Sequence, residues 1–167
     1  MGRKRPPRLP DFDYLGFHRY FLTICTEDKL PAFADLDAGQ ALAANFLRSA
    51  NAEGFAAIAY CLMPDHLHVL LKGLTEDADL RHFVRFWKQT TGFEWKRRTG
   101  ARLWQEGYFD RALRPEETDL FIIGYIALNP VDAGLAQSPF DYPLFGYSRY
   151  TKQEIQIAID ELMRSRH

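Results

Sequence analysis

Two apolar runs separated by a short turn, within residues 55–73, constrain the fold more than any other feature of this chain. The runs "FAAIAYCLM" and "HLHVLLKG" read as strands, and the dipeptide Pro64-Asp65 between them favours a turn. Because successive side chains of a strand point to opposite faces, one face of the second strand takes both His66 and His68. The other face takes three apolar residues, which are Leu67, Val69 and Leu71. We expect the apolar face to enter the core and the histidine face to carry chemistry.

Strand and helix patterns alternate around this pair. Residues 18–26 are rich in aromatic and β-branched side chains and predict a strand, whereas residues 38–53 carry apolar side chains at helical spacing. Residues 80–87 carry the apolar stripe of a second amphipathic helix. A loop should follow, because three glycines are spaced through it: Gly92, Gly100 and Gly107. A short strand is then predicted over residues 108–114.

The C-terminal part of the chain predicts two more helices. Pro115 and the acids after it make a good helix start, and Pro130 disfavours helical geometry at the residue before it. The first of these helices should therefore begin near Glu116 and end at Leu128 or Asn129. The second covers the stretch "KQEIQIAIDELMRSR" near the C-terminus.

The order of these elements predicts the fold class. Strand, helix, strand, strand, helix, strand, helix is the order of an α+β fold of the ferredoxin-like kind, with helices packed on an antiparallel sheet. The chain has 167 residues, which suits one domain with a full core. We divide it into a basic N-terminal arm, residues 1–13, and a single domain, residues 14–167.

The charges of the chain are segregated, although its net charge is only −1. Residues 1–10 carry four basic side chains and no acid, and residues 81–114 carry nine basic side chains against three acids. Such segregation gives a nearly neutral protein a local positive field, which suits a polyanion as partner. The basic residues that we expect to contact this partner are Arg3, Lys4, Arg5, Arg81, Arg85, Lys88, Lys96, Arg97 and Arg98.

The second basic stretch is also rich in aromatic residues and holds every tryptophan of the chain. Basic tracks bind phosphates while exposed rings stack on unpaired bases, so the combination points to single-stranded nucleic acid. The helical spacing of Phe83 and Trp87 favours a core position for both rings. Trp95, Trp104 and Tyr108 fall among the glycines, and we interpret them as loop residues that stack on bases.

Membrane and secretion signals are not found in the sequence. No apolar run approaches the roughly 20 residues that span a bilayer. The N-terminal "MGRKRPPRLP" is basic but has no apolar segment behind it, unlike a signal peptide. We therefore expect a cytoplasmic protein without a membrane partner.

The histidine pair has two readings. Two histidines on one strand face can direct a ring nitrogen at the same ion, which is a common way to hold a divalent metal. The same spacing is met by hydrogen-bonded or half-exposed histidines on a sheet surface. Two imidazoles leave a metal site incomplete, so a third protein ligand should lie elsewhere in the chain.

The stretch "GYIALNP", residues 124–130, offers both a third ligand and a nucleophile. If the helix runs through it, Tyr125 and Asn129 are four residues apart and share one face. A carboxamide oxygen is a hard ligand, and a phenol can act as a nucleophile. The structural alternatives are a core tyrosine with a satisfied hydroxyl and an asparagine that caps the helix end before Pro130.

Three motifs, in order, give the chain a resemblance to a known family. "MPDHLHVLL" resembles the histidine-hydrophobic-histidine (HUH) motif of the single-tyrosine, IS200-like transposases. "GYIALNPVDAGLA" resembles the tyrosine helix of their REP-associated branch, and "LWQEGYFDRALRPEETD" resembles the segment that leads into it. The likeness spans roughly residues 14–150, and three ordered motifs are far more specific than any one of them.

The resemblance implies a role for each candidate residue. His66 and His68 would be metal ligands, Tyr125 the nucleophile and Asn129 the third ligand. Asp65 would be a turn residue with at most a supporting role behind the ligands. The metal would be Mg²⁺ or Mn²⁺, whereas two histidines by themselves favour zinc.

The resemblance also implies an activity. The protein would be a metal-dependent endonuclease and strand transferase of single-stranded DNA that cleaves next to hairpin DNA through a 5′-phosphotyrosine intermediate. It would either mobilise its own element or act on repeats of the host genome such as REP elements. It would do so as a monomer or homodimer, in the cytoplasm and associated with the nucleoid.

Two other classes of function stay open. One is a hairpin- or repeat-DNA-binding protein derived from a transposase, with idle or regulatory chemistry. The other is a metal hydrolase that does not act on nucleic acid, which would leave the segregated basic charge unexplained. Tyr108 is a rival nucleophile, although the resemblance does not select it.

Overall fold

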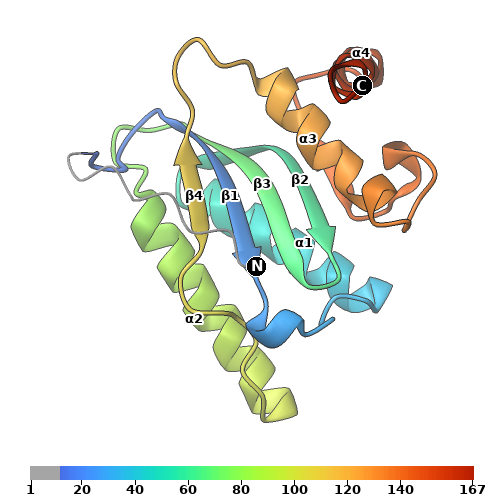
Figure 1. Cartoon of the computed structure of the whole chain (residues 1–167). Coiled ribbons are helices and arrows are strands. Elements are labelled where there is room, and N and C mark those ends of the chain that lie inside the picture. Colours follow the sequence, from blue (N-terminus) through green and yellow to red (C-terminus); the bar gives the residue numbers. More distant parts are fainter. Residues whose placement is uncertain (1–11) are drawn as a thin grey trace.

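A five-stranded antiparallel sheet forms the centre of residues 12–167, the range that the computed structural model describes (Figure 1). The strands are β1 (Arg19–Cys25), β2 (Phe55–Met63), β3 (His66–Gly73), β4 (Phe109–Ala112) and β5 (Phe145–Tyr147). They lie in the order β4-β1-β3-β2-β5, and each neighbouring pair is antiparallel. The first four strands and the two helices between them follow the ferredoxin-like order, which confirms the predicted fold class.

Helices cover both faces of the sheet (Figure 1). On one face lie α1 (Leu36–Ala52) and α2 (Leu80–Thr99), and on the other lie α3 (Asp119–Asp132) and α4 (Lys152–Ser165). Each begins after a side chain that accepts a hydrogen bond from the first turn: Asp35, Asp79, Thr118 and Thr151. Two short 3-10 turns complete the described elements, at Glu27–Lys29 and Pro139–Asp141. No helix in this range has both the length and the apolar character needed to cross a bilayer.

The sheet separates two apolar layers. Between the sheet and the first helix pair, Phe46 packs its ring against Phe83 and Trp87, with centroids 5.5 and 4.9 Å away. The apolar face of β3 enters this layer through Leu67, Val69 and Leu71, as the alternation predicted. Phe83 and Trp87 are core residues, which confirms the reading of their helical spacing.

The second layer lies beneath the tyrosine-bearing helix. Phe21 of β1 and Leu70 of β3 pack there with Ile122 and Ile126 of α3. α3 packs mainly on β2 and to a smaller extent on β3. Burial of each large apolar side chain contributes about 1.5–3 kcal/mol, so this layer fixes the helix to the sheet. The histidine face of β3 therefore lies at the edge of the area that α3 covers.

The end of α2 differs from the sequence-based expectation. The helix continues through Gly92 to Thr99, where a loop was predicted. A glycine inside a helix costs about 0.5–1 kcal/mol, but here the helix packs against Trp104, whose Nε1 atom donates to Thr91 Oγ1 over 2.9 Å. The helix ends only at Gly100, which adopts the left-handed conformation. Tertiary packing therefore overrides the local signal.

Two further elements, α3 and β5, differ from the sequence-based prediction. α3 begins at Asp119 rather than Glu116 and runs through Pro130 to Asp132, whereas the sequence predicted an end before the proline. β5 was not predicted, because three residues are too short to show strand periodicity. It pairs with β2 and extends the sheet by one strand.

Candidate functional site

The two histidines lie side by side on the face of β3 that α3 partly covers. Their ring centroids are 4.5 Å apart, with planes at 80°. His68 is buried, with 8% of its surface exposed, whereas the His66 side chain keeps 24% of its own. In the sheet, His66 pairs with Cys25 of β1 and His68 pairs with Thr23. The alternation predicted from the sequence therefore places both rings on one face.

Each ring has an oxygen beside its Nδ1 atom. Asp65 Oδ1 lies 2.6 Å from Nδ1 of His66, and Thr23 Oγ1 lies 2.9 Å from Nδ1 of His68. A carboxylate only accepts, so the Nδ1–H group of His66 donates to Asp65. Neighbours of this kind fix ring orientation and leave Nε2 as the atom with which an imidazole binds a metal. The sequence had limited Asp65 to a supporting role, and Thr23 was missed although it lies in a predicted strand.

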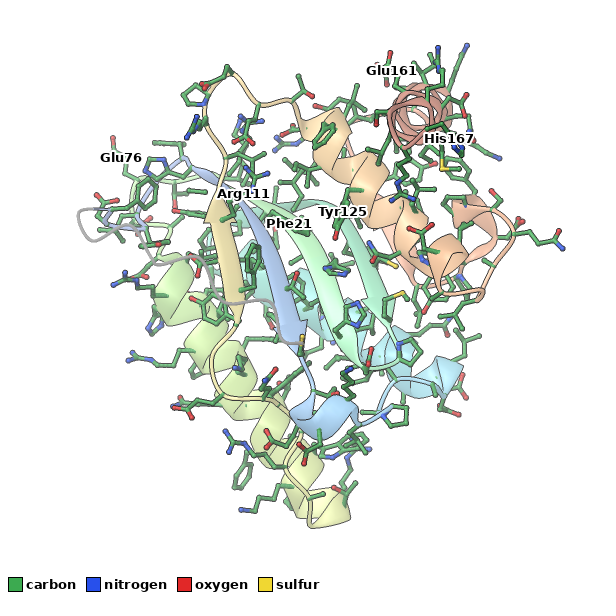
Figure 2. All side chains as sticks on the ribbon, viewed as in Figure 1. Phe21, Glu76, Arg111, Tyr125, Glu161 and His167 are labelled. Carbon is green, nitrogen blue, oxygen red and sulfur yellow. The ribbon has the colours of Figure 1, made fainter. Side chains whose placement is uncertain are left out.

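Tyr125 of α3 lies next to this pair. Its ring meets Phe21 edge-on, with centroids 5.8 Å apart, and its centroid is 6.4 Å from that of His68. Phe21 in turn stacks on His68 at 5.7 Å. Figure 2 shows Tyr125 on α3 and Phe21 on the strand beneath it. The fold thus brings the predicted nucleophile to the predicted metal ligands within one chain.

Asn129 lies one turn after Tyr125, because α3 continues past it. Its Nδ2 atom donates to the carbonyl oxygens of Tyr125 and Ile126, over 2.9 and 3.3 Å. Pro130 has no N–H group, so it cannot donate to the Ile126 carbonyl as a helical residue would. The Asn129 amide supplies that bond and stabilises the helix. Its Oδ1 atom stays a predicted metal ligand.

The donors around the histidine pair limit what kind of metal site it can form. Among the described residues, no three His, Cys, Asp or Glu side chains cluster in a way that could hold a metal. A metal at the histidine pair would need oxygen donors, from the Asn129 carboxamide, from water or from a substrate phosphate. Mg²⁺ and Mn²⁺ accept such oxygens readily.

A large basic groove lies on the other side of the sheet, along α2. It has a volume of about 1280 Å³ and is lined mainly by α2 and by the segment 102–108. Five basic side chains line it, against three acidic ones, which are Asp13, Asp79 and Glu106. The predicted DNA-binding residues that line it are Arg81, Arg85, Lys88, Lys96, Trp104 and Tyr108. Arg102 and Phe93 also line it, and the Phe93 ring is 68% exposed. His66, His68 and Tyr125 are not part of its lining.

Two tryptophans differ from their expected placement. Trp104 is only 4% exposed and packs against Phe33 and Trp87, so the expectation of an exposed loop ring is wrong. Trp95 belongs to α2 rather than to a loop, with the Arg98 guanidinium 5.6 Å from its ring centroid. The groove offers the exposed ring of Phe93. Its helical position lies opposite the apolar stripe of α2, and the sequence did not identify it because a loop was predicted there.

Lys88 and Arg97 have protein partners in this region. The Lys88 ammonium donates to the carbonyl oxygens of Gln105 and Gly107, so it ties α2 to the segment before β4. Arg97 pairs with Glu94 across one turn of α2, at 2.8 Å. Neither Arg97 nor Arg98 lines the groove. Arg3, Lys4 and Arg5 lie outside the described residues.

Other tyrosines of the chain are poor rivals for Tyr125. Burial raises the pKa of Tyr142 to about 12, and the Tyr142 hydroxyl donates to the Leu62 carbonyl. Burial also raises the pKa of Tyr20 and of Tyr60. Tyr108 packs with the α1–α2 layer, on the side of the sheet away from the histidines.

Comparisons with known proteins show the family of the chain. The profile of the family described as "Transposase IS200 like" matches residues 17–127. A protein of Haemophilus influenzae described as a REP-associated tyrosine transposase is 24% identical over 149 residues, which cover 81% of this chain and 83% of that protein.

Two solved structures share the fold. A REP-associated tyrosine transposase bound to a REP hairpin has a TM-score of 0.66 and 20% identity, over 87% of this chain and 82% of that chain. A structure from Deinococcus radiodurans described as a transposase has a TM-score of 0.52 and 22% identity, over 75% and 95%.

Proposed function

The chain belongs to the IS200-like transposase family, and we propose that it cleaves and rejoins single-stranded DNA beside a hairpin, with Tyr125 as nucleophile and a divalent metal as cofactor. The observation that carries the proposal is the position of Tyr125, whose ring centroid lies 6.4 Å from that of His68. A phenol beside two imidazoles on one face is the set of groups that metal-assisted phosphoryl transfer uses, which supports a chemical role for them.

The residues of the site would have different roles in this reaction. His66, His68 and Asn129 would hold Mg²⁺ or Mn²⁺, and Asp65 and Thr23 would keep the two imidazoles in the orientation that binding requires. A bound divalent ion polarises the scissile phosphate and stabilises the charge that develops on it. Phe21 would hold the Tyr125 ring against the sheet through its edge-on contact.

The covalent step exchanges one phosphate ester for another. The Tyr125 hydroxyl oxygen attacks phosphorus, and the bond from phosphorus to the 3′ oxygen breaks. The phenol loses a proton and the departing 3′ oxygen gains one, so a 5′-phosphotyrosine and a free 3′-hydroxyl result. A second 3′-hydroxyl can attack the phosphotyrosine and restore Tyr125, which rejoins strands without an external energy source.

The groove along α2 supports DNA as the partner. It carries five basic side chains on its lining, among them Arg81, Arg85 and Lys96, against three acidic ones, so its charge is positive overall. The exposed ring of Phe93 lies beside them. Phosphate contacts and base stacking need this combination. Hairpin DNA is the proposed ligand because one structure of the same fold is bound to a REP hairpin.

The first prediction tests the covalent chemistry. Incubation of the protein with a pool of single-stranded DNA hairpins and Mg²⁺ or Mn²⁺ should give an adduct on a denaturing gel. Tyr125→Phe should abolish the adduct and leave hairpin binding on a native gel unchanged, because the ring remains and only the nucleophile is lost. His66→Ala should reduce it at least 100-fold, on the order of a lost metal ligand.

Tyr147→Phe is the matched control, since this tyrosine is exposed and lies on β5, away from the histidines. An adduct that survives Tyr125→Phe would refute the assigned nucleophile. Hairpin binding without any adduct in the unmodified protein would favour a DNA-binding protein with idle chemistry.

A further inference from the structure

We propose that Arg19 and Asp119 position Tyr125 over the histidine pair, so that β1 sets the place of both the nucleophile and the metal ligands. This inference rests on the proposed function for its catalytic meaning. Its physical content is that an ion pair between β1 and the first residue of α3 fixes where the tyrosine helix lies on the sheet.

Two side chains from separate segments donate to the Asp119 carboxylate. Arg19 Nη1 donates to Asp119 Oδ1 over 2.7 Å, and the Tyr150 hydroxyl donates to Asp119 Oδ2 over 2.9 Å. Arg19 Nη2 donates in addition to the Arg114 carbonyl, over 2.9 Å. The side chains of Arg19 and Asp119 keep only 18% and 13% of their surface exposed. Charge-assisted bonds in such a place are short, directional and little screened by salt.

One face of β1 contacts α3 at its start, the Tyr125 ring and the His68 ring, in addition to the direct packing of α3 on β2 and β3. Arg19, Phe21 and Thr23 alternate along the strand and therefore share a face. Arg19 binds the start of α3, Phe21 contacts Tyr125, and Thr23 lies beside His68. A shift of α3 along the sheet would lengthen the hydrogen bond between Arg19 and Asp119, which depends steeply on distance and angle.

Apolar packing alone would hold α3 less strictly. Apart from the polar contacts at its ends, α3 rests on the sheet and on α4 through aliphatic side chains and through Gly124, which lies against the backbone of Ala158. Hydrophobic contact is not directional, so it permits small slides that hydrogen bonds to a guanidinium do not. Tyr125 follows Asp119 by six residues, about 9 Å along a rigid helix, so a displaced start moves the tyrosine.

A second ion pair at the other end of α3 supplies a matched control. Arg166 Nη1 lies 3.2 Å from Asp132 Oδ2, and these side chains keep 36% and 53% of their surface exposed. Arg166→Gln removes a guanidinium that pairs with an aspartate of the same helix, at its opposite end. Because exposed pairs contribute little, it should leave Tyr125 in place.

The experiment measures position and chemistry separately. Fluorine NMR of 3-fluorotyrosine introduced only at position 125 reports the contact with Phe21 and His68. Arg19→Gln should move this resonance toward that of the unfolded protein, and Arg19→Lys should move it less, because lysine keeps the charge but cannot reach both acceptors. Arg166→Gln should leave the resonance unchanged.

Adduct formation gives the second measurement, on protein with the natural Tyr125. With a hairpin from the binding pool at saturating concentration, Arg19→Gln should slow adduct formation about 10- to 100-fold, as a misplacement of about 1 Å does. Hairpin affinity should change less than about twofold, because the loss falls on the chemical step. If Arg19→Gln does not fold, Tyr150→Phe removes one bond to Asp119 and should give a smaller loss in the same direction.

The outcomes separate this inference from the proposed function. A resonance and a rate that stay at their original values in both Arg19→Gln and Tyr150→Phe would overturn it, and so would an equal effect of Arg166→Gln. If the unmodified protein forms no adduct, the proposed function fails, while the fluorine resonance still decides whether Arg19 holds Tyr125 in place.

Discussion

At the scale of single residues, the two histidines differ in how their neighbours are supplied. Asp65 precedes His66 directly in the sequence, whereas Thr23 reaches His68 from another strand. Both neighbours touch Nδ1, and both would therefore raise the affinity of Nε2 for a metal by holding the ring in one orientation. A local neighbour is visible in the sequence, and a neighbour from β1 is visible only once the strands are paired.

Thr23→Val tests this residue. The substitution keeps the shape of the side chain and removes the oxygen beside His68, so we expect the affinity for Mn²⁺ to fall about tenfold. Isothermal titration calorimetry measures the change. Thr99→Val on the exposed end of α2 is the control and should leave the affinity unchanged. An unchanged affinity in Thr23→Val, with complete loss in His68→Ala, would exclude the orienting role.

At the scale of elements, the continuation of α3 through Pro130 depends on the Asn129 side chain, which replaces the hydrogen bond that the proline cannot donate. Because of Pro130 the sequence predicts an end at Leu128 or Asn129, whereas the helix continues to Asp132. Asn129 makes this possible by donating to the carbonyls of Tyr125 and Ile126. The same continuation is what keeps Asn129 on the face of Tyr125, where a third metal ligand is predicted.

A double-mutant cycle tests the compensation. Asn129→Ala should lower the free energy of unfolding by about 1–2 kcal/mol, because it leaves a carbonyl without its donor. Pro130→Ala restores an N–H group at that carbonyl, so Asn129→Ala should cost about half as much in that background. Urea denaturation measures both values. Equal costs in the two backgrounds would show that Asn129 does not compensate for the proline.

At the scale of the whole molecule, the basic groove and the histidine pair lie on opposite sides of one sheet. The groove follows α2, whereas the histidines face α3. A DNA ligand that used both would have to pass around the edge of the sheet. Binding and chemistry should therefore respond to different substitutions.

Arg85→Gln and Lys96→Gln test this separation. Each should weaken hairpin binding and reduce the slope of log K against log salt by about 0.7–0.9, as the loss of one phosphate contact does. Neither should slow adduct formation at saturating DNA. Arg97→Gln is the matched control, since Arg97 is on the same helix but pairs with Glu94. Fluorescence anisotropy at several salt concentrations measures the slopes, and equal slopes for all variants would place the DNA elsewhere.

Structural features that follow from a short repeat in the sequence, or from the order of the elements, were predicted correctly. The alternation along β3 placed the two histidines on one face, and the apolar stripe of α2 placed Phe83 and Trp87 in the core. The order of strands and helices was sufficient for the fold class. A single glycine or proline was a less reliable signal of a helix end. Gly92 and Pro130 both lie inside helices, which are stabilised by tertiary packing in α2 and by the Asn129 amide in α3.

The sequence by itself determined which side chains share a face of a strand or a helix, because that depends only on the period of the local backbone. Tertiary structure alone decided which faces meet: Arg19 with Asp119, Thr23 with His68, and Tyr125 with Phe21. It also decided that Trp104 is buried while Phe93 is exposed. Contacts between segments far apart in the chain depend on strand order and on where helices cross the sheet, and no local period encodes either.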